Sequence, residues 1–134
     1  MSTAVWPMRE AIDGALTGDV TFAALIGTRA YDESERPEGA TLPFISYGTP
    51  TERAFDTFSG DGNDGTAILH LYGANGKVVA AMYGHVNRLL HNKTLVVTGH
   101  VALVLRTSLL EIRTDPSGAA HGIVRVSALT QAAA

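Results

Sequence analysis

The chain has 134 residues, a hydrophobic fraction of 46%, a charged fraction of 17% and a formal net charge of −3 at pH 7. This length predicts one domain over residues 1–134, which can bury roughly two-thirds of the surface that the unfolded chain exposes. The negative charge argues against a protein that grips nucleic acid through clustered Lys and Arg, and the lack of cysteine excludes disulfides and thiolate sites. No run approaches the roughly 18 apolar residues of a membrane span, so we expect a cytosolic chain without membrane contact.

The N-terminal third predicts two helices and a loop. Apolar residues recur at helical spacing at Val5, Met8, Ile12 and Leu16. Gly18 marks the end of this first helix, and Asp19 can cap a second, short helix that Gly27 ends. The stretch 32–39 is polar and irregular, which is typical of an exposed loop.

The middle of the chain predicts two strands and a second main helix. Leu42 to Thr49 and Thr66 to Tyr72 have strand character, and the second of them alternates apolar with more polar side chains. Between them, Thr51 to Gly65 reads TERAFDTFSGDGNDG, and its glycines and acidic residues favour turns in a long hairpin loop. After a turn at Gly73 to Gly76, a broad apolar face over 78–90 predicts a helix that covers a sheet.

The C-terminal third predicts strands only. Leu95 to Thr98 and Val101 to Arg113 are strand-like, and a turn at Asp115 to Gly118 leads to a last strand at Gly122 to Leu129. We expect the last two strands to pair as an antiparallel hairpin. The fold class is therefore α+β in two layers, with a mixed, mostly antiparallel sheet packed against two main helices and carrying a long hairpin loop.

Motifs for catalysis or metal binding are absent from the sequence. The chain has five histidines, at His70, His85, His91, His100 and His121. None lies in a His-x-His pair or a His-Glu-x-x-His helix, so we expect them to lie apart and to hold no metal. Gly76 and Lys77 fail the P-loop pattern at two positions, and no Gly-x-Ser-x-Gly elbow occurs. We therefore predict no enzyme and no cofactor.

The segment Thr51 to Gly65 is the most unusual part of the sequence. A calcium site there is disfavoured, because the acidic spacing does not match an EF-hand and no Glu follows to close it. The segment mixes aromatic residues with both signs of charge, as interface centres and rims do. The candidate interface residues are Arg53, Phe55, Asp56, Phe58, Asp61 and Asp64. The alternative is that Phe55 and Phe58 fold back onto the core of this chain.

The order of several short segments resembles the tail-completion, or tail-terminator, proteins of long-tailed phages, prophages and gene transfer agents. These segments are Ala24 to Asp32, Leu42 to Gly48 (LPFISYG), Leu69 to Tyr72, Thr114 to Gly118 (TDPSG) and His121 to Thr130 (HGIVRVSALT). The resemblance spans nearly the whole chain. One departure is Tyr72-Gly73, where such relatives often have Trp-Ser or a similar pair.

The resemblance implies a structural subunit of a virion or phage-like particle that is made in the host cytoplasm. Such subunits form a six-membered ring at the head-proximal end of the tail tube, stop tube growth and join the tail to head-completion, or stopper, proteins. The partners would be further copies of the chain, the tail tube protein and the stopper protein. DNA would pass through the ring without specific binding, as the modest negative charge of the chain also suggests.

Two alternatives remain open at this stage. The chain could be another head–tail connector or minor tail component with the same fold, because sequence hardly separates these roles. From a different class, it could be a small ligand-binding domain or enzyme, which would need a pocket with convergent polar groups.

Overall fold

The computed structural model describes residues 5–48, 50–57, 60–94, 96–97, 100–114, 116 and 118–132. The helices are α1 (Val5–Thr17), α2 (Val20–Ile26), the single 3-10 turn η1 (Glu33–Glu35) and α3 (Gly76–Leu90). The strands are β1 (Ala30–Asp32), β2 (Phe44–Tyr47), β3 (Thr51–Thr57), β4 (Gly60–Gly73), β5 (Val96–Val97), β6 (His100–Thr114) and β7 (Ala120–Ala132). Within the described ranges, no helix is long and apolar enough to cross a membrane.

All of these strands belong to one mixed sheet in the order β1-β2-β4-β7-β6-β5, and β3 pairs with β4 beside β2. Only β1 and β2 run parallel, and the other pairs of described strands are antiparallel. The long strand β4 pairs with β7 from Gly62↔Gln131 to Gly73↔Ala120. On its other side β4 pairs first with β3 and then with β2, so β2 and β3 follow one another along the same edge of β4.

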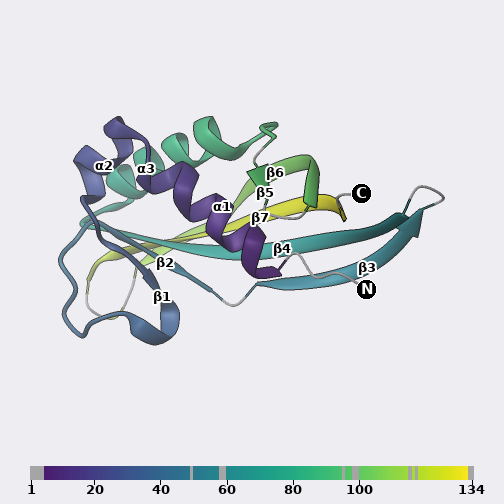
Figure 1. Cartoon of the computed structure of the whole chain (residues 1–134). Coiled ribbons are helices and arrows are strands. Elements are labelled where there is room, and N and C mark those ends of the chain that lie inside the picture. The colour runs from purple at the N-terminus through teal and green to yellow at the C-terminus, as the bar shows by residue number, and fades with distance from the viewer. Residues whose placement is uncertain are drawn as a thin grey trace.

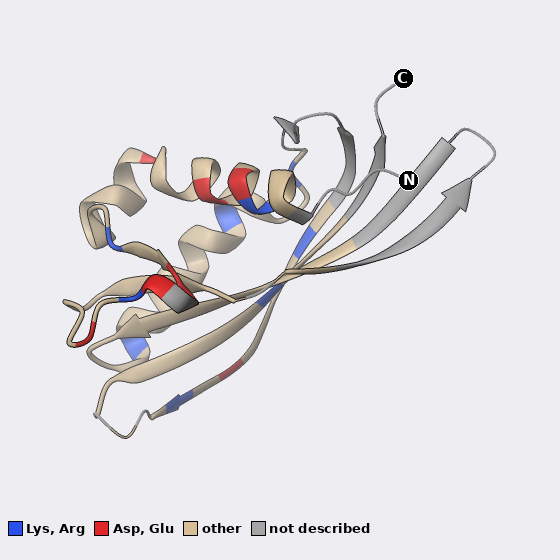
Figure 2. Ribbon diagram, turned by 60° about the horizontal axis from the view of Figure 1, so that its bottom comes forward, with Lys and Arg blue, Asp and Glu red and all other residues tan. Residues whose placement is uncertain are grey.

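The helices α1 and α3 lie on one face of the sheet, and the opposite face carries none of the described α-helices (Figures 1 and 2). Strand alternation sends one set of side chains into the space beneath the helices. The fully buried residues there include Leu69 and Leu71 of β4, Leu105 of β6, and Val124 and Val126 of β7. The predicted two-layer α+β class is confirmed.

The ends of α2 follow the predicted capping pattern, and Asn75 adds a cap to α3. The carboxylate of Asp19 accepts a hydrogen bond from the backbone N–H of Phe22, and the side chain of Asn75 accepts one from Val78. Gly27, with φ of 60°, ends α2 in a conformation that favours glycine. Arg88 of α3 donates to Asp19 at 2.8 Å and thereby links the two helices, and this hydrogen bond holds the pKa of the Asp19 carboxyl below its usual value.

Two segments differ from the sequence prediction. Residues 30–32, for which the sequence predicted no strand and of which only Asp32 belongs to the predicted irregular stretch, form the parallel strand β1, because β2 offers an edge that local sequence cannot reveal. The segment Thr51 to Gly65, expected to consist of turns, is instead mostly strand in the β3–β4 hairpin, with backbone pairing from Thr51↔Thr66 to Thr57↔Gly60. Pairing with β7 holds the glycine-rich start of β4 extended despite its low intrinsic strand preference.

The contact between α3 and the sheet depends on small residues beneath the helix. An added Cβ at Gly122 of β7 would lie 2.5 Å from Cγ1 of Val79, which is fully buried in α3. The absence of a side chain at Gly122 therefore sets how closely α3 approaches β7.

Gly122→Ala should lower the free energy of unfolding by about 1–3 kcal/mol, since Val79 cannot move away without disturbing the core. Gly84→Ala is the matched control, because Gly84 lies within α3 and an added Cβ meets nothing within 4 Å. It should raise stability by about 0.5–1 kcal/mol through helix propensity. Urea unfolding monitored by circular dichroism measures both, and equal stability of the two variants would contradict this description of the helix–sheet contact.

Candidate functional site

The β3–β4 hairpin extends beyond the part of the sheet that the helices cover (Figure 1). Within it, the register places Arg53 opposite Asp64, Phe55 opposite Gly62, and Asp56 opposite Asp61. Five of the six candidate interface residues therefore belong to one antiparallel ribbon, whereas Phe58 lies outside the described residues. The side chains of these five also lie outside the description, so the choice between interface and core for the aromatic residues stays a prediction.

The pairing of Asp56 with Asp61 brings two acidic positions directly opposite one another. Like charges at opposite positions of an antiparallel pair destabilise it by a few tenths of a kcal/mol up to about 1 kcal/mol. The ribbon also contains Glu52 and Asp64 but only one basic residue, Arg53. It therefore carries a surplus of negative charge that a cationic surface on another molecule could neutralise.

The helix-free face of the sheet carries a row of rings that crosses four strands. It runs through Tyr31 of β1, Phe44 of β2, Tyr72 of β4 and His121 of β7. Phe44 and Tyr72 stack with centroids 4.7 Å apart, and Tyr72 and His121 stack at 4.4 Å. The alternation of β4 that buries Leu69 and Leu71 beneath the helices directs Tyr72 to this opposite face.

A groove opens beside this row, between the segment 36–42 and the turn at 118–119. The Arg36 guanidinium carbon lies 5.1 Å from the Tyr72 ring centroid and 5.7 Å from that of Phe44, which is a cation–π arrangement. The groove has a volume of about 780 Å³. It is lined by Arg36, Pro37, Glu38, Gly39, Ala40, Leu42, Phe44, Tyr72, Ala74, Gly118 and Ala119.

Two histidines that were expected to lie apart meet on the same face, which corrects the sequence prediction. Nδ1 of His70 and Nε2 of His121 are 2.8 Å apart, a distance at which one ring donates and the other accepts. They come from neighbouring strands in which His70 pairs with Ile123 and His121 with Tyr72, so the contact is a diagonal one. Burial lowers the pKa of His70; nearby Glu33 opposes this shift, while Arg36 and Arg113 add to it.

This pair does not complete a catalytic or metal-binding set. Ser46 is opposite His70 in the register, but its buried hydroxyl forms no hydrogen bond in the described part of the chain. Ser46 and His70 therefore do not form a nucleophile–base pair among the described residues. Among the described residues, no group of three or more His, Cys, Asp or Glu side chains could hold a metal ion.

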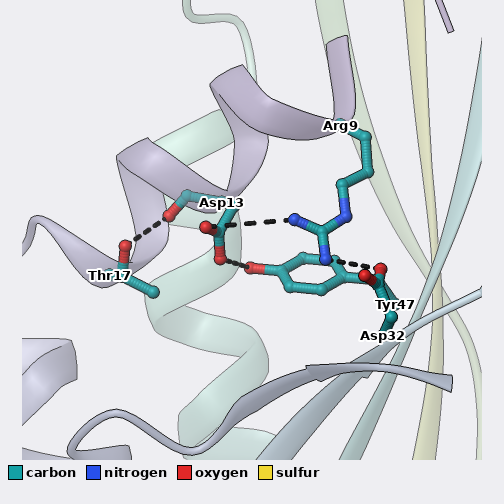
Figure 3. Close-up of polar contacts among 5 residues, drawn as sticks. All are labelled: Arg9, Asp13, Thr17, Asp32 and Tyr47. Carbon is teal, nitrogen blue, oxygen red and sulfur yellow. Dashed lines mark hydrogen bonds and ion pairs between the residues drawn. The ribbon is translucent and has the colours of Figure 1, made fainter. Parts of the chain in front are cut away.

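A polar cluster fixes α1 to the sheet at β1 and β2 (Figure 3). Nη2 of Arg9 is 2.5 Å from the Asp32 carboxylate, and its guanidinium lies over the Tyr47 ring at 4.0 Å. The Tyr47 hydroxyl donates a 2.6 Å hydrogen bond to Asp13. Burial, reinforced by this hydrogen bond, raises the pKa of Tyr47, so the hydroxyl remains a donor at physiological pH. The cluster positions the helix layer rather than forming a binding site.

Sequence reasoning missed the ring row, the histidine pair and the Arg9 cluster. Each joins residues far apart in the chain, such as His70 with His121 and Arg9 with Asp32. The alternation in β4 was the one available signal, because it predicted His70 and Tyr72 on the same face of one strand. Their partners depend on strand order and register, which the sequence did not supply.

Two comparisons with known proteins found a match, one to a family model and one to a solved structure. The family model described as "Tail completion protein gp17" matches residues 10–131. Among solved structures, a chain of the "Virion of native gene transfer agent (GTA) particle" superposes with a TM-score of 0.80 at 21% sequence identity, covering 98% of this chain and 100% of that one. At this identity the superposition establishes a shared fold. A search of curated proteins found no match.

The lowered pKa of His70 predicts a pH dependence of stability. Below the usual value of 6.5 the unfolded chain binds a proton at this residue more readily than the folded chain does, so the free energy of unfolding should fall as the pH drops. His70→Asn should reduce this loss between about pH 7.5 and about pH 5.5. His85→Asn, on the helix side, serves as the control for replacement of a histidine outside the His70–His121 pair. Chemical denaturation across this range measures the slopes, and identical slopes for wild type and His70→Asn would refute the assignment.

Proposed function

Because the chain belongs to the tail completion protein gp17 family, whose model matches residues 10–131, we propose that it ends tail-tube growth by forming a ring at the head-proximal tip. Membership makes it a structural tail completion protein of a phage-type particle. Beyond this membership we propose that the ring is a hexamer, that it lies between the tube and the head-completion proteins, and that residues 1–134 form one domain.

The sheet has edges suited to contacts between subunits. The outer edge of β3 has no partner strand in the described part of the chain, and β5 covers β6 only at His100 and Val101. Unpaired strand edges invite pairing with other chains, and closure into a ring removes such edges from solvent. A ring built from one repeated contact between two different patches also closes without leaving a free patch.

Termination of a tube requires a subunit with two different faces. One face must accept the last ring of tube protein, and the other must present a surface that further tube subunits do not recognise. The helix-covered face and the helix-free face of this sheet differ strongly in chemistry, since the first carries α1 and α3 and the second carries the ring row. This asymmetry is the observation that supports the terminating role.

The net charge of −3 supports a ring through which DNA slides rather than binds. Tight binding of DNA depends on neutralisation of many phosphates by Lys and Arg. The shared fold with a chain of a gene transfer agent virion further supports a place within such a particle.

The groove beside Tyr72 favours a small ligand-binding role as the second candidate, and an apolar ligand bound by the isolated monomer would support it.

The direct test mixes the purified chain with tail tube protein during tube assembly and images the tubes by cryo-electron microscopy. We expect one ring of the chain at one end of each tube and shorter tubes as its concentration rises. Density of the chain repeated along the tube, or unchanged tube length with no ring, would rule out the terminating role.

The β3–β4 hairpin should contribute to assembly rather than to the fold of the monomer. Phe55→Ala with Phe58→Ala should leave cooperative thermal unfolding unchanged and impair ring formation on tubes, because aromatic anchors dominate interface energies. Val20→Ala is the control for loss of an exposed apolar side chain, as Val20 lies on α2 with 84% of its surface exposed. Loss of cooperative unfolding in the double variant would instead assign the aromatic residues to the core.

A further inference from the structure

One edge of the sheet combines exposed apolar and basic side chains. On β6, Leu110 is 50% exposed and Ile112 is 39% exposed, and Arg106 is exposed as well. Arg125 of the adjacent strand β7 is exposed too, and its register position next to Ser108 makes it a near neighbour of Arg106. Neither arginine forms an ion pair in the described part of the chain. We name these four residues the basic edge.

The opposite edge of the sheet combines exposed apolar side chains with three exposed carboxylates and one exposed arginine, Arg36, which lies over the Tyr72 ring. The segment that follows β1 carries the exposed residues Glu33, Glu35 and Glu38, and acidic residues gather there in Figure 2. These carboxylates form no ion pair within the described residues. Leu42 is 37% exposed and lines the groove together with Phe44. We name Glu33, Glu35, Glu38 and Leu42 the acidic edge.

The two edges cannot satisfy one another within one subunit. The strand order places β1 and β6 four strand spacings apart, which corresponds to about 19 Å at roughly 4.8 Å per spacing. Coulomb attraction over that distance is largely screened at physiological salt, where the Debye length is about 8 Å. Each edge therefore keeps its own excess of charge in the isolated chain.

We propose that the basic edge of one subunit docks on the acidic edge of the next copy. Arg106 and Arg125 meet the carboxylates of Glu35 and Glu38, and the exposed leucine of β6 enters the groove beside Leu42. The contact joins two different patches, so its repetition closes into a ring when the rotation between neighbours completes a full turn, and it rests on the ring that we propose as the function. Charge complementarity sets register and direction, while burial of the leucines contributes most of the affinity.

The exposed arginines could instead serve either of two roles, and each role predicts a different result. Arginines on an open strand could simply prevent β6 from pairing with other chains, in which case their reversal to glutamate would not impair the ring. Alternatively, they could bind the phosphates of DNA, in which case reversal would weaken DNA binding and leave ring assembly intact.

Charge reversal on each edge provides the test, with ring formation on tail tubes as the measurement. The basic-edge variant is Arg106→Glu with Arg125→Glu, and the acidic-edge variant is Glu35→Lys with Glu38→Lys. Each variant alone should lose ring formation at least about ten-fold, because like charges then face one another across the contact. Lys77→Glu, an exposed reversal at the start of α3, is the control and should retain wild-type assembly.

Complementation separates this contact from a general effect of altered charge. A chain carrying all four reversals should recover ring formation, because each edge again faces its opposite. An equimolar mixture of the two reversed variants should also recover it, as alternating subunits in an even-numbered ring. If the single-edge variants assemble as well as wild type, or if neither combination restores assembly, the proposed contact is wrong.

Disulfide trapping gives an independent measurement, since the chain contains no cysteine. Glu35→Cys and Arg106→Cys in one chain lie too far apart for a bond within a subunit, because a disulfide needs Cα atoms within about 7 Å. After oxidation on tubes we expect a ladder of covalent oligomers that stops at the ring size, and monomer only from each single cysteine. Dimers from either single cysteine would indicate a two-fold contact and overturn the proposal.

The wild-type chain distinguishes failure of this contact from failure of the function. Wild-type rings on tubes, together with charge variants that assemble normally, would reject the contact and leave the terminating role in place. Absence of wild-type rings under all assembly conditions would instead reject the proposed function itself.

Discussion

The pairing of β4 with β7 from Gly62↔Gln131 to Gly73↔Ala120 is the interaction on which the rest of the structure depends. One half of this ladder lies beneath the helices, where Leu69, Leu71, Val124 and Val126 are buried. The other half continues past the helices and holds β4 extended so that β3 can pair with it (Figure 1). The same two strands thus build both the core and the projecting hairpin.

Packing of α1 and α3 on the same face leaves the sheet with two chemically different sides. Beneath the helices the core is mostly aliphatic, and the Arg9 cluster with Asp13, Asp32 and Tyr47 fixes α1 to the sheet (Figure 3). On the other side, which no described helix covers, stacked rings and the Arg36 guanidinium cover part of the sheet. For the terminating role that we propose, such a difference matters because a stack grows only while each exposed face is complementary to the next subunit.

Charged side chains are distributed unevenly across the sheet, so that its two edges differ in charge. Carboxylates gather beside β1, arginines gather on β6 and β7, and the hairpin contributes further acidic residues. A net charge of −3 hides this pattern, because it sums residues that lie on opposite edges. The contact that we propose between subunits therefore depends on where charges lie rather than on how many there are.

The sequence by itself determined the α+β class, both main helices, the cap at Asp19 and the final antiparallel hairpin, because helical periodicity, strand alternation and capping are local properties. It also identified the segment Thr51 to Gly65 as unusual, and its resemblance to tail completion proteins agrees with the family. Tertiary structure alone decided that this segment is mostly strand and that His70 meets His121, since both depend on the register of β4 against β7. It also decided which charges share an edge. Register and strand order arise from the simultaneous burial of residues distant in the chain, which no local pattern records.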